Sequence, residues 1–200
     1  MSDDLDMKPP NSPCYSCRDP EPNREALIGY LRQQREWITL GRRSKPAVEG
    51  WLQKVVEGES FTGSVVVDAN DPWIDELIEL LPPGPERLYL YADMSSLIEF
   101  YAGLSGNAKI RVCFAMGSHS QTAPILEGRK EHWMACCYAG PKTEWACADA
   151  RARQSRGLES QPGDVLLSKR DDVMGRCIDY ESGDLGLGDK RLVMRIVVDR

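Results

Sequence analysis

Histidine is scarce in this 200-residue chain, which contains only His119 and His132. A non-haem iron centre needs two histidines and a carboxylate around open coordination positions. Neither histidine belongs to a His-x-Asp or His-x-Glu pair, and the chain has no Gly-rich phosphate loop and no Gly-x-Ser-x-Gly motif. We therefore expect no metal ion, no other cofactor and no catalytic residue of a familiar kind in this chain.

Long apolar runs and an excess of basic residues are also missing. No run approaches the roughly 20 apolar residues that a membrane helix needs, and the opening stretch MSDDLDMKPP has no apolar segment of the kind found in signal peptides. The net charge is −6, so no broad basic surface exists to neutralise nucleic-acid phosphates or an anionic membrane. We expect a cytoplasmic protein with no nucleic-acid or membrane partner.

The seven cysteines do not indicate a disulfide framework, because their number is odd and a cytoplasmic chain keeps its thiols reduced. Cys14 and Cys17 form a single Cys-x-x-Cys pair, whereas a structural zinc site needs four ligands. We interpret this pair as reduced thiols, although a metal site or a redox pair stays open. The cysteines within apolar runs are expected to be buried and inert.

The first half of the chain reads as mainly helical. Proline-rich residues 1–22 are expected to form a loosely ordered tail. Residues 23–106 are expected to form a mainly helical lobe. Within this lobe we predict helices at 23–40, after Pro46, at 71–81 and at 95–106, and strands at 64–70 and 87–93.

The second half, residues 107–200, is rich in β-branched residues and in Gly-, Pro- and Asp-containing connections. The predicted strands are KIRVCFAM, HWMACCYA, GDVLLSK, GRCIDYE and RLVMRIVVD. Residues 148–164 are polar and are expected to form a solvated loop. The fold class is therefore α+β, with an N-terminal helical half packed on a C-terminal antiparallel β-sandwich or jelly-roll-like domain.

The stretch CCYAGPKTEW, residues 136–145, reads as a strand that runs into a Gly-Pro turn. Its residues Tyr138, Gly140, Pro141, Thr143, Glu144 and Trp145 match a Tyr-x-Gly-Pro-x-Thr-Glu-Trp pattern. This pattern, together with Gly-Asp-Val-x-Leu-x-Lys at 163–169, resembles a bacterial family with a helical first half and a jelly-roll-like second half. The resemblance implies that the Gly-Pro turn and the Glu-Trp pair belong to the scaffold of the β half.

The chain departs from this family pattern where the family has His-x-Asp and a later His. These positions fall on Glu127, on Arg129 and near Cys177. If the family uses these residues to hold a metal, the resemblance implies that this chain has lost the site, since an arginine repels a cation.

Charged and aromatic residues around the strand at 133–139 are candidates for binding a peptide or a partner protein. Basic side chains beside an exposed strand can bind carboxylates. The candidate binding residues are Arg129, Lys130, His132, Tyr138, Lys142 and Glu144.

In size, acidity and helix-then-strand layout the chain is similar to the accessory-subunit family of iron-dependent methanobactin synthases. The resemblance implies a non-catalytic subunit that binds a cysteine-containing precursor (leader) peptide by strand addition. It also implies a partner, a TIM-barrel iron oxidase, in which the iron resides. The alternative is a stand-alone, metal-dependent oxygenase-like enzyme with an altered metal site that involves Glu127, His132, Cys136 and Glu144.

Overall fold

The computed structural model describes most of the residues from position 46 onward and two short segments before it. The described residues are 14–17, 37–40, 46–118, 121–122, 133–147, 158–168, 173–178 and 190–199. Of the predicted tail, only Cys14–Cys17 falls within them, as strand β1.

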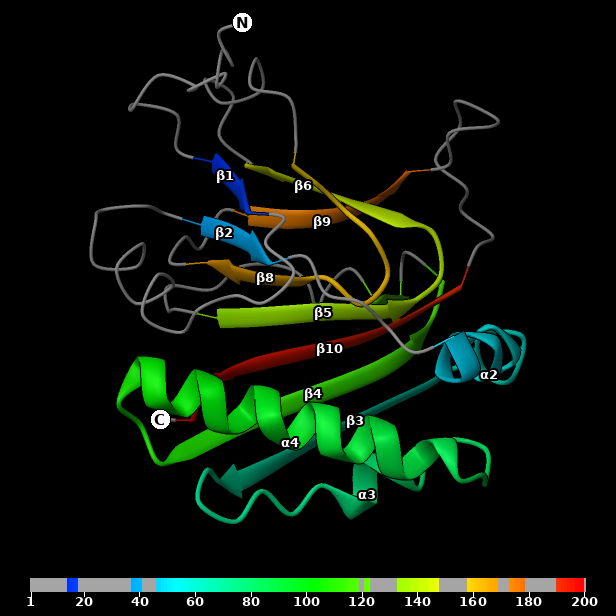
Figure 1. Ribbon diagram of the computed structural model, residues 1–200, viewed down its shortest axis with the longest axis horizontal. Helices are drawn as coiled ribbons and strands as arrows, with labels where there is room; N and C mark the ends of the chain where they lie inside the picture. The colour runs from blue at the N-terminus through cyan, green and yellow to red at the C-terminus, as the bar shows by residue number, and fades with distance from the viewer. Residues whose placement is uncertain are drawn as a thin grey trace, which may run out of the picture.

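A large, mostly antiparallel sheet forms the centre of the molecule (Figure 1). Its strands are β1 (Cys14–Cys17), β2 (Trp37–Leu40), β3 (Phe61–Asp68), β4 (Lys109–Gly117), β5 (Trp133–Ala139), β8 (Val165–Ser168) and β10 (Arg191–Val198). They lie in the order β1-β2-β8-β5-β10-β4-β3. β10 pairs antiparallel with both β4 and β5, so the last strand of the chain lies inside the sheet.

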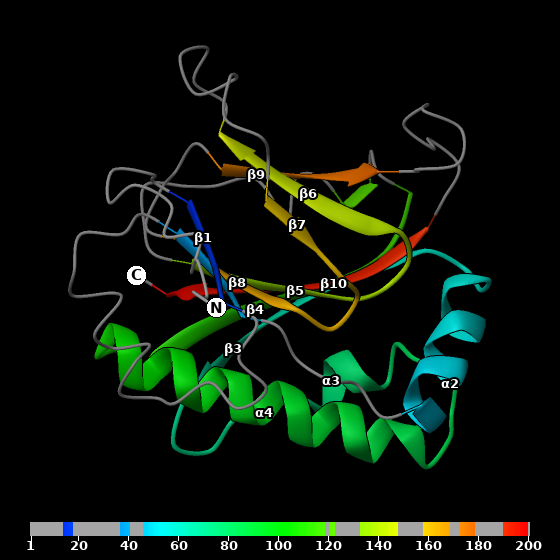
Figure 2. The ribbon, with the colours of Figure 1, turned by 45° about the horizontal axis from the view of Figure 1, so that its top comes forward.

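A small sheet lies over one face of the large one (Figure 2). Its strands are β6 (Lys142–Cys147), β7 (Leu158–Ser160) and β9 (Val173–Ile178), in the order β7-β6-β9. The predicted Gly-Pro turn connects β5 to β6, and Gly140 has a φ of 107° there. This left-handed backbone suits glycine and directs the chain from one sheet to the other.

Helices α2 (Pro46–Val56), α3 (Asp75–Ile78) and α4 (Glu86–Ser105) cover the opposite face of the large sheet (Figures 1 and 2). Pro46 starts α2, where its missing N–H is not needed. α4 ends at Gly106, whose φ of 70° provides a left-handed cap. None of the described helices is long and apolar enough to cross a bilayer.

The apolar core lies between these helices and the large sheet. Leu90, Met94 and Ile98 recur along one side of α4 and are buried. They belong to the same core as Met194 and Ile196 of β10. Full burial of each such side chain contributes about 1.5–3 kcal/mol.

Two predicted elements are wrong. Residues 87–93 form part of α4 and not a strand, because their alternating Leu-Tyr pattern is overridden by the helical spacing of apolar residues that continues to Tyr101. Within the predicted helix at 23–40, Trp37–Leu40 is β2, which pairs antiparallel with β8; the rest of that helix lies outside the described residues. Leu158–Ser160, in the predicted loop, forms β7.

The predicted combination of helices with antiparallel strands is confirmed, as are the strands at β3, β4, β5, β8 and β10. β3, from the first half of the chain, pairs along its whole length with β4, from the second half. The division into a lobe at 23–106 and a domain at 107–200 stays a prediction.

Candidate functional site

The two faces of β10 have different chemistry. Leu192, Met194 and Ile196 point toward the helices and are fully buried. Arg191 and Arg195 occupy alternate positions of the same strand and therefore project from the other face, which the small sheet covers. Arg191 is 0% exposed and Arg195 is 4% exposed. A buried arginine carries its charge into a medium where that charge must be compensated, so this face of β10 is chemically unusual.

The buried polar side chains of the described residues gather in the layer between the two sheets. They are Thr122, Thr143, Ser160, Ser168, Arg191 and Arg195. Thr143 and Ser160 are register partners in the small sheet, and the Ser160 hydroxyl donates to the Thr143 carbonyl oxygen over 3.5 Å. We call these residues, together with Cys137, the inter-sheet polar layer.

Thr122 fixes the position of the Arg191 side chain. The Nε–H of Arg191 donates to Thr122 Oγ1 over 2.6 Å, and the Thr122 hydroxyl donates to the Ser118 carbonyl oxygen over 3.0 Å. The Ser118 N–H donates to Gln121 Oε1 over 2.8 Å, which is one half of a capping box. The short turn after β4 thus holds a hydroxyl against the guanidinium.

Small residues bring the backbone close to Arg191. Gly117 is its register partner on β4. A Cβ at Gly140 would lie 2.7 Å from Arg191 Cβ and 2.7 Å from the Lys190 carbonyl oxygen. A larger residue at position 140 would therefore displace the start of β10 or the turn itself.

Cys137 adds a thiol to the inter-sheet polar layer. It is 2% exposed, and the Thr143 hydroxyl donates to its Sγ over 3.3 Å. Burial raises the pKa of the Cys137 thiol, while the charge of Arg191 and the bond from Thr143 act in the opposite direction. The thiol is therefore neutral at neutral pH, in agreement with the expectation of an inert, buried cysteine, and it does not cancel the positive charge of Arg191.

Arg195 has a different environment. Its guanidinium carbon lies 5.0 Å from the ring centroid of Trp133, which is fully buried. Such a cation–π contact favours a desolvated arginine. Trp133 pairs with Val197, so Arg195 leans along the strand and away from Arg191. The two arginines therefore belong to separate parts of the layer.

The predicted binding residues are only partly described. Arg129, Lys130 and His132 lie outside the described residues. Lys142 is half-buried at the start of β6, and Glu144 is the register partner of Arg176 on β9.

Tyr138 lies on the helix-facing side of the large sheet, opposite to Arg191. Its hydroxyl donates to Asp93 Oδ2 on α4 over 2.8 Å, and the side chain is 7% exposed. The structure thus does not bring Tyr138 together with the inter-sheet polar layer.

Metal-binding residues do not converge in the described part of the chain. No group of three His, Cys, Asp or Glu side chains there is arranged to hold an ion. Both histidines, together with Glu127 and Arg129, lie outside that part.

The sequence analysis missed Arg191, Arg195 and Thr122. One signal was present, because RLVMRIVVD contains two arginines at alternating positions of an otherwise apolar strand. A strand buried on both faces normally reads as a continuous apolar run. The two arginines therefore mark one face as polar.

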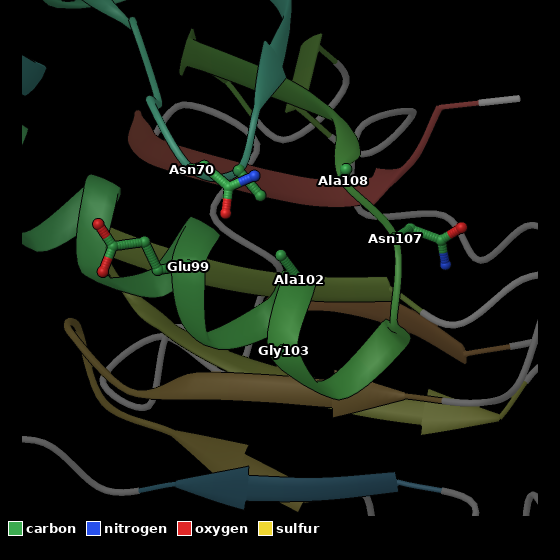
Figure 3. A pocket seen from close by; sticks show the side chains of 7 residues that line it. Asn70, Glu99, Ala102, Gly103, Asn107 and Ala108 are labelled. Carbon is green, nitrogen blue, oxygen red and sulfur yellow. The ribbon is translucent and has the colours of Figure 1, made fainter.

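A hollow lies at the end of α4, apart from the inter-sheet polar layer, and has a volume of about 510 Å³ (Figure 3). Glu99, Ala102 and Gly103 of α4 line one side, and Asn70 and Ala108 line the other. The Asn70 N–H donates to Asp68 Oδ1 beside it, and this bond lowers the pKa of Asp68. The hollow is open and offers one carboxylate and two amides, with no nucleophile, so we do not favour it as the site.

Comparisons with solved structures return proteins of similar layout but low sequence identity. A BsmA homolog from Methylobium petroleophilum PM1 is 14% identical, with a TM-score of 0.47, over 92% of this chain and 96% of that chain. A putative oxygenase from Shewanella oneidensis is 10% identical, with a TM-score of 0.45, over 92% and 89%. A prolyl-4-hydroxylase from Pseudomonas putida is 12% identical, with a TM-score of 0.43, over 88% and 99%. Similarities of this strength carry no functional inference.

Comparison of the sequence with family models assigns the chain to a family. The search of curated proteins gave no significant match. A family model described as "Protein of unknown function (DUF1826)" matches residues 23–174, which include the Gly-Pro turn and most of both sheets. The chain therefore belongs to the DUF1826 family.

Proposed function

We propose that the protein binds a small carboxylate-containing molecule between its two sheets, with Arg191 as the cation that receives the carboxylate. The observation that carries this proposal is the fully buried guanidinium of Arg191, held by Thr122 among hydroxyl groups and a neutral thiol. Enclosed sites with a few convergent polar groups are typical of small-molecule binding.

The geometry of Arg191 favours a carboxylate over other anions. Thr122 receives the Nε–H of Arg191 and thereby sets the orientation of the guanidinium plane. Two parallel N–H groups match the two oxygens of a carboxylate, which makes such pairs strong and directional.

A jelly-roll description of the β region belongs to the same proposal. From β4 onward the chain crosses between the two sheets four times. β4, β5, β8 and β10 belong to the large sheet, and β6, β7 and β9 belong to the small one. This repeated crossing between two stacked sheets is typical of jelly rolls.

Of the two functions predicted from the sequence, an enclosed acid-binding layer suits the oxygenase-like alternative better. Peptide capture uses exposed strand edges or grooves, whereas an enclosed layer admits small molecules. The metal of that alternative has no ligand set among the described residues, so we derive no metal-dependent step. The accessory role, with a precursor peptide and a TIM-barrel iron oxidase, stays a hypothesis that depends on Arg129, Lys130 and His132.

Calorimetric titration with acetate, succinate and 2-oxoglutarate tests the proposal. We expect saturable binding of at least one acid by the wild-type protein and a loss of about tenfold or more in Arg191→Met, because a charged hydrogen bond contributes about 1.5–3 kcal/mol. Arg111→Gln is the matched control. Arg111 is a half-exposed arginine on β4 that is paired with Asp199 at 2.6 Å. This control should bind the acids as the wild type does.

A second variant keeps the test informative if Arg191→Met does not fold. Thr122→Val keeps the shape of the side chain but removes the hydroxyl that holds Arg191, so we expect weaker acid binding with an unchanged circular dichroism spectrum. Failure of the wild type to bind any acid, or equal affinity in wild type and folded Arg191→Met, would overturn the proposal.

A further inference from the structure

Strand β3 forms one end of the large sheet. Its partner is β4, with which it pairs from Phe61↔Met116 to Asp68↔Lys109. Among the described residues, no backbone group outside β4 forms a hydrogen bond with the main chain of residues 61–67. Within the described part of the chain, the outer N–H and C=O groups of this strand therefore form an open edge that another strand can join.

The sequence of β3 does not protect this edge. Natural edge strands are usually blocked by lysine, proline, a bulge, short length or a covering helix or loop. Here α3 contacts β3 on the helix-facing side of the sheet, where Leu77 and Leu80 lie against Gly63. FTGSVVVD has no lysine and no proline, spans Phe61–Asp68 and pairs with β4 without a bulge. Val66 is 40% exposed on it. A strand edge without such protection favours aggregation unless a partner covers it.

An apolar cleft opens beside the start of this strand, on the helix-facing side of the sheet. Its volume is about 230 Å³. It is lined by Val55, Gly58, Glu59, Phe61, Leu80, Leu81, Pro82 and Met116. Leu80 is 39% exposed, so the cleft is accessible. A cavity of about 150 Å³ accepts a benzene ring, so this cleft has room for one large apolar side chain.

The edge and the cleft suit the same ligand. A strand that pairs with β3 projects alternate side chains to the side on which Phe61 lines the cleft. One such side chain would therefore lie over the cleft while the backbone pairs with β3. Backbone hydrogen bonds would provide affinity, and the cleft would provide specificity.

The surface charge around this edge is acidic. Glu57, Glu59, Asp71 and Glu79 are exposed. Of the basic side chains nearby, Lys109 is paired with Asp68 at 3.6 Å, and Arg111, the register partner of Val66, is paired with Asp199 at 2.6 Å. Arg87 and Lys190 donate to backbone carbonyl oxygens beside the cleft and keep their charges, so the carboxylates are in excess but not alone. A second copy of the chain would bring the same carboxylates together, and like charges disfavour such pairing. A basic partner would be attracted instead.

We propose that the β3 edge and its cleft dock an extended, basic segment of another protein by strand addition, with one large apolar side chain of that segment in the cleft. This surface is separate from the inter-sheet polar layer. This surface would attract a basic segment, whereas the predicted basic residues around β5 would attract an acidic one.

Fluorescence anisotropy with short synthetic peptides tests this docking site. The first probe is Lys-Val-Lys-Val-Phe-Val-Lys-Val-Lys, the second has Ser in place of Phe, and the third has Glu in place of each Lys. We expect the first probe to bind the wild-type protein about tenfold more tightly than either control, since each loses one of the two proposed contacts.

Lysine substitutions at exposed positions locate the binding. Leu80→Lys at the cleft and Val66→Lys on the edge strand should each weaken binding of the first probe by about tenfold. Leu88→Lys is the matched control. Leu88 is 75% exposed on α4, so this substitution adds the same charge at a position away from the edge and the cleft. Neither the probes nor these substitutions involve Arg191, so failure of the acid-binding proposal does not affect this one.

Three results would overturn the proposal. The first is equal affinity for all three probes, and the second is an equal loss of affinity in Leu88→Lys. The third is a light-scattering result in which the wild-type protein is a dimer and the Val66→Lys variant is a monomer. In that case a second copy of the chain, and not a basic segment of another protein, would occupy the edge.

Discussion

At the residue scale, the environment of Arg191 depends as much on small neighbours as on the arginine itself. Thr122 holds the guanidinium from a turn 69 residues away in the sequence. Gly140 allows the β5–β6 turn to approach the start of β10. The site is therefore sensitive to changes that do not alter its charge.

Replacing Gly140 with alanine tests this dependence. The backbone there has a φ of 107°, and the new Cβ would lie 2.7 Å from Arg191 Cβ. We expect Gly140→Ala to lower the free energy of unfolding by about 1–3 kcal/mol, as strained backbone positions do. Urea denaturation measures the change.

Gly50 in α2 is the matched control for this prediction. No heavy atom lies within 4 Å of a Cβ at Gly50. Alanine favours a helix interior over glycine, so Gly50→Ala should raise the free energy of unfolding by about 0.5–1 kcal/mol. The same sign for both substitutions would contradict the assigned role of Gly140.

At the element scale, Arg87 joins α4 to the end of α3. Its Nε–H donates to the Pro82 carbonyl oxygen over 3.0 Å. Its Nη2 donates to the Glu79 carbonyl oxygen over 3.2 Å and also to that of Leu81. These carbonyl groups belong to the connection between α3 and α4, so this arginine stabilises that connection.

We expect Arg87→Met to lower the free energy of unfolding by about 1–2 kcal/mol, because carbonyl groups lose a charged donor. Arg111→Gln removes an exposed ion pair with Asp199 and should cost about 1 kcal/mol or less. Chemical denaturation of both variants compares them. A larger loss in Arg111→Gln than in Arg87→Met would argue against the assigned role of Arg87.

At the scale of the whole molecule, the large sheet connects the two halves of the chain. β3 pairs with β4 along its whole length, and α2 and α4 both contact β10. Elements that share a sheet and a core unfold together in a two-state transition. We therefore expect the two predicted regions, 23–106 and 107–200, to unfold together.

Thermal unfolding followed at two wavelengths tests this unity. We expect far-ultraviolet circular dichroism, which reports mainly on the helices, and tryptophan fluorescence, to which Trp133 in β5 contributes, to give the same midpoint. Two separate transitions would instead support an independent helical lobe at 23–106 and a β domain at 107–200.

The sequence by itself determined the strands β4, β5 and β10 and the Gly-Pro turn between β5 and β6. These features depend on residues that are close together in the chain, namely apolar runs and a glycine followed by a proline. The resemblance based on Tyr138 to Trp145 indicated a bacterial family, and the DUF1826 match now gives the chain a family assignment.

Only the tertiary structure decided that residues 87–93 are helical, that Trp37–Leu40 pairs with β8, and that Thr122, Cys137 and Arg191 share one layer. Local propensity is weak and is overridden by burial against elements that are distant in sequence. Strand order determines which face of β10 is covered by helices and which by the small sheet. The chemistry around Arg191 follows from that order, because Thr122 and Arg191 become neighbours only after β4 and β10 have paired.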